Sequence, residues 1–231
     1  MSGEIGLQVK AILTQKDYGG LLDLCEQDRR YWKALRLYVY ETDDNLRWPA
    51  VEAIARLVQR WWQGGREEKV REYIRGLFWS LNDESGGIGW NAPQIIAETI
   101  VLVPELIEPY GSMMIDRTME ESLLVKSGLW GIGRMGSPIG KAVEFFRDMI
   151  LQSFENDDPQ TIGLAAWAMG TVGFAPALTY LENLIDRRET ARIYVDGGLK
   201  EKPLGEWADE AISRIDKLPK YDSIMSQGID Q

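Results

Sequence analysis

The segment from Trp79 to Pro93 carries the side chains best suited to binding or catalysis. It reads Trp-Ser-Leu-Asn-Asp-Glu-Ser-Gly-Gly-Ile-Gly-Trp-Asn-Ala-Pro, with three glycines and two carboxylates between two tryptophans. Glycine permits positive φ angles and lets the backbone pass close to a ligand. Asp83 and Glu84, together with Glu98 further along the chain, could bind a cation or act as acid and base. Backbone N–H groups at the start of the following helix could bind an anion.

We therefore predict a ligand or partner site at residues 79–93. The alternative is a conformationally demanding turn in which Asn82 and Asp83 act as capping residues. The segment contains neither GxxxxGK[ST] nor a strand-anchored GxGxxG, so no phosphate-binding loop is predicted. A second glycine-rich stretch, 131–136, is interpreted as tight helix packing, from which Arg134 could point outward toward a carboxylate or ligand. The candidate binding residues are Trp79, Asn82, Asp83, Glu84, Trp90, Asn91, Glu98 and Arg134.

The chain contains nine tryptophans, and their roles could be of two kinds. An exposed tryptophan in a groove binds peptides or bases through its large area and its polar N–H. A tryptophan at a repeated helix position packs between layers instead. We expect packing for most of the nine and partial exposure for Trp79 and Trp90, which flank the glycine-rich segment.

A basic and aromatic stretch runs from Gln59 to Arg66, and further cations follow up to Arg75. Arginines among aromatic rings can stack on bases or bind acidic peptides. However, three glutamates between residues 67 and 72 dilute this charge, and Glu67 and Arg71 are spaced for an i,i+4 ion pair. A solvated helix start is therefore the preferred interpretation.

The composition excludes several classes of site. There is no histidine, so a Ser-His-Asp triad and a His-ligated zinc or di-iron site are excluded. The single cysteine, Cys25, allows neither an internal disulfide nor a thiolate zinc site, and it is interpreted as a core residue. A net charge of −10 disfavours nucleic acid and favours a protein partner, in particular a basic one. No cofactor or metal is predicted.

The same sequence carries no sign of membrane insertion or export. No apolar run reaches the length of about 18 residues that a membrane span needs, and the N-terminus lacks a secretory pattern. We therefore expect a cytoplasmic location. The oligomeric state stays open.

An internal repeat defines the elements that must position these residues. A polar turn followed by a helix rich in small and apolar residues recurs, and its aligned small residues stand 36–43 residues apart. Such a period is typical of a two-helix solenoid repeat, in which small residues let neighbouring helices approach closely. Trp48 and Trp90 share one repeat position, and Trp130 and Trp167 share another. The aligned small residues are Ala55, Ala97, Gly133, Gly170 and Ser213.

The intervening segments supply the second helix of each pair. Residues 67–81 carry one apolar stripe at i, i+3, i+4, i+7 and i+8, which predicts a helix. Residues 139–154 and 175–185 show the same helical spacing. The fold prediction is therefore all-α: an α-solenoid of about five stacked antiparallel helix pairs.

The pattern resembles the HEAT-repeat family, in the bacterial subgroup with phycobilin-lyase-type repeats. The resemblance rests on residues 44–57, 131–136 and 158–173, and it covers roughly residues 44–218. Arg47 matches the family's arginine position, whereas the other copies depart from it. The resemblance implies HEAT-like repeats, but it implies much less about function, because unrelated proteins use these repeats.

We predict one solenoid domain over residues 1–218. Within it, residues 1–43 form an N-terminal helical cap, 44–187 the repeats, 188–205 an inserted loop or small hairpin, and 206–218 a last helix. Residues 219–231 are expected to form a polar tail.

The predicted function is a non-enzymatic scaffold that binds a protein or ligand through a concave helical-repeat face and the segment 79–93. The alternative is a HEAT-like enzyme or chaperone. By resemblance this could be a tetrapyrrole lyase or a DNA glycosylase, the latter disfavoured by the acidity. The deoxyhypusine hydroxylase type needs paired His-Glu motifs for iron and is excluded.

Overall fold

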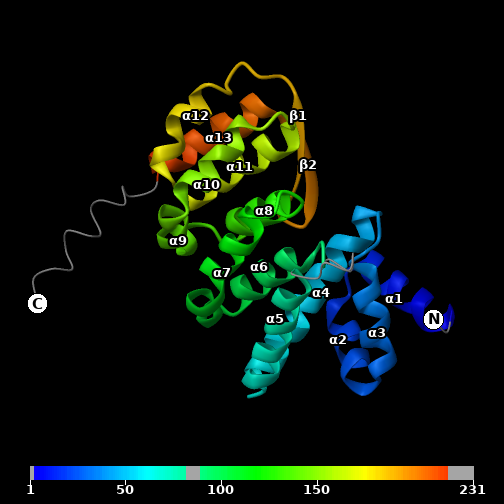
Figure 1. Ribbon diagram of the computed structural model, residues 1–231. Helices are drawn as coiled ribbons and strands as arrows, with labels where there is room; N and C mark the ends of the chain where they lie inside the picture. Colours follow the sequence, from blue (N-terminus) through cyan, green and yellow to red (C-terminus); the bar gives the residue numbers. More distant parts are fainter. Residues whose placement is uncertain (1–2, 82–88, 218–231) are drawn as a thin grey trace, which may run out of the picture. The chain divides into compact units, whose positions relative to one another are not determined.

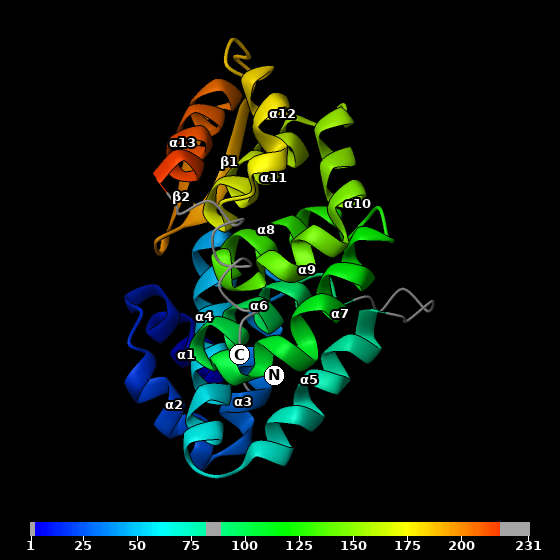
Figure 2. The same cartoon turned by 90° about the vertical axis from the view of Figure 1, so that its left-hand side faces the viewer.

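The computed structural model describes residues 3–81 and 89–217, and almost all of its regular structure is helical (Figures 1 and 2). The chain divides into two compact units, Met1–Arg117 and Thr118–Gln231, and each is described by itself below. The candidate residues Asn82, Asp83 and Glu84, and the predicted tail, lie outside the described residues. The single domain remains a prediction.

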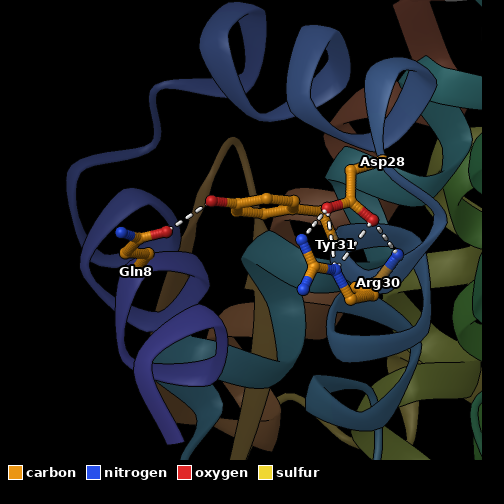
Figure 3. Close-up of polar contacts among 4 residues, drawn as sticks. All are labelled: Gln8, Asp28, Arg30 and Tyr31. Atoms are coloured by element: carbon orange, nitrogen blue, oxygen red, sulfur yellow. Dashed lines mark hydrogen bonds and ion pairs between the residues drawn. The ribbon is translucent and has the colours of Figure 1, made fainter. Parts of the chain in front are cut away.

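Unit 1 begins with three short helices, as the sequence predicts for its N-terminal cap. Asp28 caps α3 by accepting a hydrogen bond from the Arg30 N–H at 2.8 Å, and its carboxylate also pairs with the Arg30 side chain (Figure 3). The Tyr31 hydroxyl donates to Oε1 of Gln8, which ties α3 to α1 (Figure 3). The three helices are α1 (Gly3–Gln15), α2 (Tyr18–Gln27) and α3 (Arg29–Tyr38).

The longest helix of unit 1, α4, packs against the three N-terminal helices and against α5 and α6. Its alanines at 50, 53 and 55 are fully buried, which allows the close approach that the repeat predicts. Helix α5 has the predicted bounds and buries Val70, Ile74, Phe78 and Leu81 along one stripe. The remaining elements are α4 (Asp44–Gln63), α5 (Glu67–Leu81), α6 (Ala92–Leu102), the 3₁₀ turn η1 (Pro104–Leu106) and α7 (Ile107–Met119).

In unit 2, α11 is the central helix, packed against α8, α13 and the strand β1. A Cβ on Gly133 would collide with the Trp167 ring, and a Cβ on Gly170 would lie 2.5 Å from the Ala211 Cα. Both predicted small positions are therefore set by close packing. The helices of unit 2 are α8 (Val125–Met135), α9 (Gly140–Phe145), α10 (Arg147–Leu151), α11 (Pro159–Val172), α12 (Leu178–Glu182) and α13 (Leu204–Lys217).

The predicted helix over 139–154 is divided into α9 and α10, and 3₁₀ turns flank the pair. Phe146 ends α9 with φ −97° and ψ 17°, outside the helical region, and its ring packs edge to face on Phe145 at 4.8 Å. The flanking turns are η2 (Ser137–Ile139) and η3 (Gln152–Glu155), and a third 3₁₀ turn of unit 2, η4 (Ala175–Ala177), precedes α12.

The segment predicted as an inserted loop or hairpin contains an antiparallel hairpin of β1 (Thr190–Val195) and β2 (Gly198–Pro203). Asp196 and Gly197 make its two-residue turn with φ angles of +53° and +77°. Positive φ at both positions is the requirement of a type I′ turn, which Asp-Gly satisfies at low cost. The strand β1 lies between β2 and α11 (Figure 2).

Candidate interaction surface

The residues that flank the glycine-rich segment are held together. The Gly89 N–H donates to the Ser80 carbonyl oxygen at 3.2 Å, and a Cβ on Gly89 would collide with the Ser80 side chain. Trp79 and Trp90 are the immediate neighbours of this pair. Their Cα atoms therefore lie at most about 15 Å apart, from two Cα–Cα steps of about 3.8 Å and the span of one backbone hydrogen bond.

Both of these tryptophans are exposed, in agreement with the expectation from the sequence. The Trp79 side chain is 80% exposed and that of Trp90 is 45% exposed. Trp32 and Trp62 are half-buried, and the other five are buried: Trp48, Trp61, Trp130, Trp167 and Trp207. The two exposed indoles of the chain thus lie on either side of one segment.

Asn91 anchors this region to the end of α3. Its side-chain amide donates to the Val39 carbonyl oxygen at 2.5 Å, and the side chain is buried. The next residue after Val39, Tyr40, is 58% exposed. Tyr40, Trp79 and Trp90 are thus each next in sequence to a residue of these two hydrogen bonds, which link the ends of α3 and α5 to the start of α6, and we refer to these three residues as the aromatic surface.

The other described candidate residues lie elsewhere. Glu98 is buried in the middle of α6, so its carboxylate does not belong to the aromatic surface. Arg134 lies in the last turn of α8 in unit 2, where Lys200 foremost, and also Arg214 and Arg134, lower the pKa of Asp196. The structure thus brings together Trp79, Trp90 and Asn91 from the predicted set.

Comparisons with known proteins place the chain among helical-repeat proteins. No protein-family model matches it. An uncharacterized protein of Archaeoglobus fulgidus is 30% identical over 140 residues, which span 59% of this chain and 71% of that protein. The chain belongs to the family of this archaeal protein.

Solved structures that resemble this chain are helical-repeat proteins as well. A designed armadillo repeat protein in complex with the peptide (KR)4 superposes with a TM-score of 0.57 at 17% identity, over 91% of both chains. Computationally designed armadillo repeat proteins for modular peptide recognition superpose at 0.52 and 17% identity, over 93% and 94% of the two chains. The fold is therefore of the armadillo and HEAT-like type, as the resemblance implies. The phycobilin-lyase subgroup remains a prediction.

An aromatic cluster that was not predicted from the sequence lies beside the aromatic surface in this repeat protein. Trp32, Trp61 and Tyr73 pack edge to face, with ring centroids 5.6–6.1 Å apart. The Lys69 ammonium lies 3.5 Å from the Trp61 ring centroid, and burial lowers the pKa of Lys69. Burial also raises the pKa of Tyr73, on which Arg36 and Tyr40 act electrostatically. The i,i+4 spacing of Trp32, Arg36 and Tyr40, the first two on α3 and the third just beyond its end, was the available signal.

The cations of the basic stretch are engaged in ion pairs. Arg60 pairs with Asp23 at 2.6 Å, and Arg66 pairs with Glu26. On α5, Glu67 and Arg71 form the predicted i,i+4 pair at 3.8 Å, and Arg75 pairs with Glu68 at 2.6 Å. This agrees with the interpretation as a solvated helix start.

Three other findings bear on chemistry within the described residues. No group of three or more Asp, Glu or Cys side chains is arranged to hold a metal ion. No helix there is both long enough and apolar enough to cross a membrane. Cys25 is buried, and burial raises the pKa of its thiol to about 12.

Proposed function

We propose that this protein is a non-enzymatic scaffold that binds a protein partner through the aromatic surface of unit 1. The observation that carries the proposal is the exposure of Trp79 and Trp90 on either side of a segment whose flanks are hydrogen bonded. Tryptophan contributes most to binding when it becomes buried in an interface, because it removes a large apolar area from water. Two such side chains on one junction are costly to leave in water unless a partner covers them.

We further propose that the partner segment is rich in Lys and Arg. The faces of exposed indoles attract cations, with a gain of about 0.5–1 kcal/mol for each exposed contact. Glu41, next to Tyr40, makes no ion pair with another described residue, and Asp83 and Glu84 follow Trp79 by four and five residues in the sequence. The designed armadillo protein of similar fold was solved with a (KR)4 peptide, which supports a basic partner for an acidic member of this fold.

The enzyme and chaperone alternatives gain less support. A DNA glycosylase would need a basic face, whereas the cations of the basic stretch pair with carboxylates. Glu98, the carboxylate expected to work with the segment 79–93, is buried in α6.

The experiment measures binding of the octapeptide (KR)4 by calorimetry, with (DE)4 as the peptide of opposite charge. The variant Trp79→Ala with Trp90→Ala should weaken (KR)4 binding about tenfold or more, which corresponds to about 1.4 kcal/mol. Phe145→Ala is the matched control, because Phe145 is 81% exposed and lies in unit 2. It should leave the affinity unchanged.

Both variants should keep their thermal midpoint, because substitutions of exposed side chains change stability by about 0.5 kcal/mol or less. Equal affinity for (KR)4 and (DE)4 would overturn the basic partner. Unchanged (KR)4 binding by the double variant would overturn the aromatic surface as the site.

A further inference from the structure

The hairpin of unit 2 has one edge that α11 covers and one edge that pairs with no further strand among the described residues. Gln160 of α11 holds the covered edge: its Nε2 donates to the Arg192 carbonyl at 2.9 Å, and the Arg192 N–H donates to its Oε1 at 2.9 Å. The indole N–H of Trp130 donates to the Tyr194 carbonyl at 2.9 Å. The main-chain groups of Arg192 therefore face α11 and not β2, and the Tyr194 carbonyl lies on the same edge.

This arrangement determines which groups of β2 face outward. In the antiparallel register Arg192 is opposite Glu201, and Tyr194 is opposite Leu199. Since Arg192 directs its N–H and C=O away from β2, Arg192 and Glu201 form a non-hydrogen-bonded pair. Such pairs alternate along an antiparallel ladder, so Tyr194 and Leu199 form one as well. The N–H and C=O of Leu199 and Glu201 consequently point to the outer edge. There they make no backbone hydrogen bond with another described residue.

A pocket of about 540 Å³ is lined by Pro203, the last residue of β2, together with residues 185–188 and the first turns of α13. Three of its carboxylates, on Asp186, Glu206 and Asp209, make no ion pair with another described residue. Its other charges include Arg188 and two engaged side chains: Arg187 pairs with Glu189 at 2.8 Å, and Glu210 pairs with Lys202. The balance of the unpaired charges is negative, which suits a guanidinium or an ammonium group.

We propose that an extended segment of a protein partner adds to β2 as a third, antiparallel strand and places an Arg or Lys side chain in this pocket. In strand addition the main-chain hydrogen bonds supply affinity, and a pocket for one side chain supplies specificity. Pro203 stands two residues, about 7 Å, beyond Glu201 along β2. The basic residue therefore lies near the N-terminus of the added strand, which runs in the opposite direction to β2.

The side chains of β2 could be taken as evidence against strand addition. Charged residues and proline on an edge strand commonly prevent unwanted pairing. Here, however, Lys200 pairs with Asp196 at 2.8 Å, and Lys202 pairs with Glu210 while its ammonium lies 4.6 Å from the Trp207 ring centroid. Both lysines are thus neutralised within the unit, so they do not repel a basic segment.

The test uses the full chain and three short peptides. The probe is acetyl-Arg-Thr-Val-Thr-Val-Thr-amide; one control peptide carries the arginine at the other end, and a second has glutamine in its place. We expect the probe to bind at least tenfold more tightly than either control. It should also slow hydrogen exchange of the Leu199 and Glu201 amides, measured residue by residue by NMR. Equal binding of the three peptides, or unchanged exchange at both amides, would overturn the proposal.

Two variants separate the pocket from the edge. Glu206→Gln with Asp209→Asn should remove the preference for the probe while leaving the backbone intact, and Glu155→Gln with Asp157→Asn is the matched control on the same unit. Glu201→Pro removes one outward N–H and should abolish exchange protection at Leu199. If Glu201→Pro impairs folding, the charge variant still decides the outcome, because a retained preference would contradict the pocket.

This inference is independent of the proposed function. The variant Trp79→Ala with Trp90→Ala should bind the probe peptide with unchanged affinity, because every group invoked here belongs to unit 2. Failure of strand addition would thus leave the aromatic surface standing, and failure of (KR)4 binding at that surface would leave strand addition standing.

Discussion

The two units differ in the exposure of their tryptophans. In unit 2 all three are buried, and two of them donate their indole N–H to β1: Trp130 to the Tyr194 carbonyl and Trp207 to the Ala191 carbonyl at 3.1 Å. The third, Trp167, packs against Gly133. In unit 1, Trp48 and Trp61 are buried as well, but Trp79 and Trp90 are exposed. Within unit 2, each buried indole therefore has either a carbonyl acceptor on β1 or a glycine on the neighbouring helix.

Position in the repeat does not decide this outcome. Trp48 and Trp90 occupy one repeat position, yet Trp48 is buried and Trp90 is exposed. Trp130 and Trp167 share another position and are both buried. The hairpin, an element added between repeats, supplies the carbonyl acceptors of two buried indoles in unit 2.

The close glycine contacts of unit 2 should tolerate substitution least. In Gly170→Val the new side chain would meet the backbone of Ala211, which cannot move without displacing α13. We expect unit 2 to lose about 3 kcal/mol of unfolding free energy, the upper end for overpacking. Hydrogen exchange of the α11 amides should accelerate more than that of the α4 amides. Unchanged exchange in α11 would contradict the role of this glycine.

Removal of an indole hydrogen bond to β1 should lower the unfolding free energy by the next largest amount. Trp130→Phe keeps a large ring but leaves the Tyr194 carbonyl without this donor, which should cost about 1–2 kcal/mol. Trp79→Phe, the matched change in unit 1, should alter stability by about 0.5 kcal/mol or less, because its ring lies in solvent. Urea denaturation of both variants measures the difference. Equal losses would remove the distinction between the units.

The acid sensitivity of unit 2 should depend on Asp158. This residue caps α11 by accepting from the Gln160 N–H at 3.2 Å, and Lys126 lies 3.0 Å from its carboxylate. Burial tends to raise the pKa of Asp158, but the hydrogen bonds from Lys126, Thr161 and the Gln160 N–H lower it below its usual 3.8. Because the folded pKa is the lower one, the stabilisation is present above pH 4 and is lost as the pH falls through the folded value.

Asp158→Asn retains a capping oxygen but removes the charge. It should cost a few tenths to about 1 kcal/mol at pH 7, since the pair with Lys126 is partly screened by solvent, and progressively less as the pH falls through the folded pKa. Asp43→Asn in unit 1 is the control, because Asp43 caps α4 and makes no ion pair with a described residue. A cost for Asp158→Asn that persists at pH 2 would refute the electrostatic explanation.

The sequence predicted those features of the fold that depend on local pattern. The apolar stripe over residues 67–81 predicted the bounds of α5. Apolar residues that recur with the 3.6-residue period of a helix mark its buried face. The small residues at 133 and 170 predicted close helix contacts, and the structure supplies their partners, Trp167 and Ala211. The division of residues 139–154 into α9 and α10 was missed, because neither glycine nor proline marks the break at Phe146.

The candidate sites were harder to predict from the sequence than the fold. Exposure of Trp79 and Trp90 followed from their position beside a glycine-rich segment. The burial of Glu98 did not follow from the sequence, because polar and apolar residues around it in α6 show no clear periodic pattern. The pocket in unit 2 joins residues near 186 with residues near 206, which come together through the hairpin. Contacts of this kind arise from tertiary packing, and a periodic pattern does not encode them.

Substitution of Gly76 should have the smallest effect on stability, and it should be stabilising, in contrast to substitution of Gly170. Gly76 lies in the middle of α5, and a Cβ placed on it would meet no atom within 4 Å. Gly76→Ala should therefore stabilise unit 1 by up to about 1 kcal/mol, because alanine loses less backbone entropy than glycine when a helix forms. Urea denaturation measures the gain. A loss of stability would mean that α5 meets a neighbour at this position, and that the open face on which Trp79 also lies is covered.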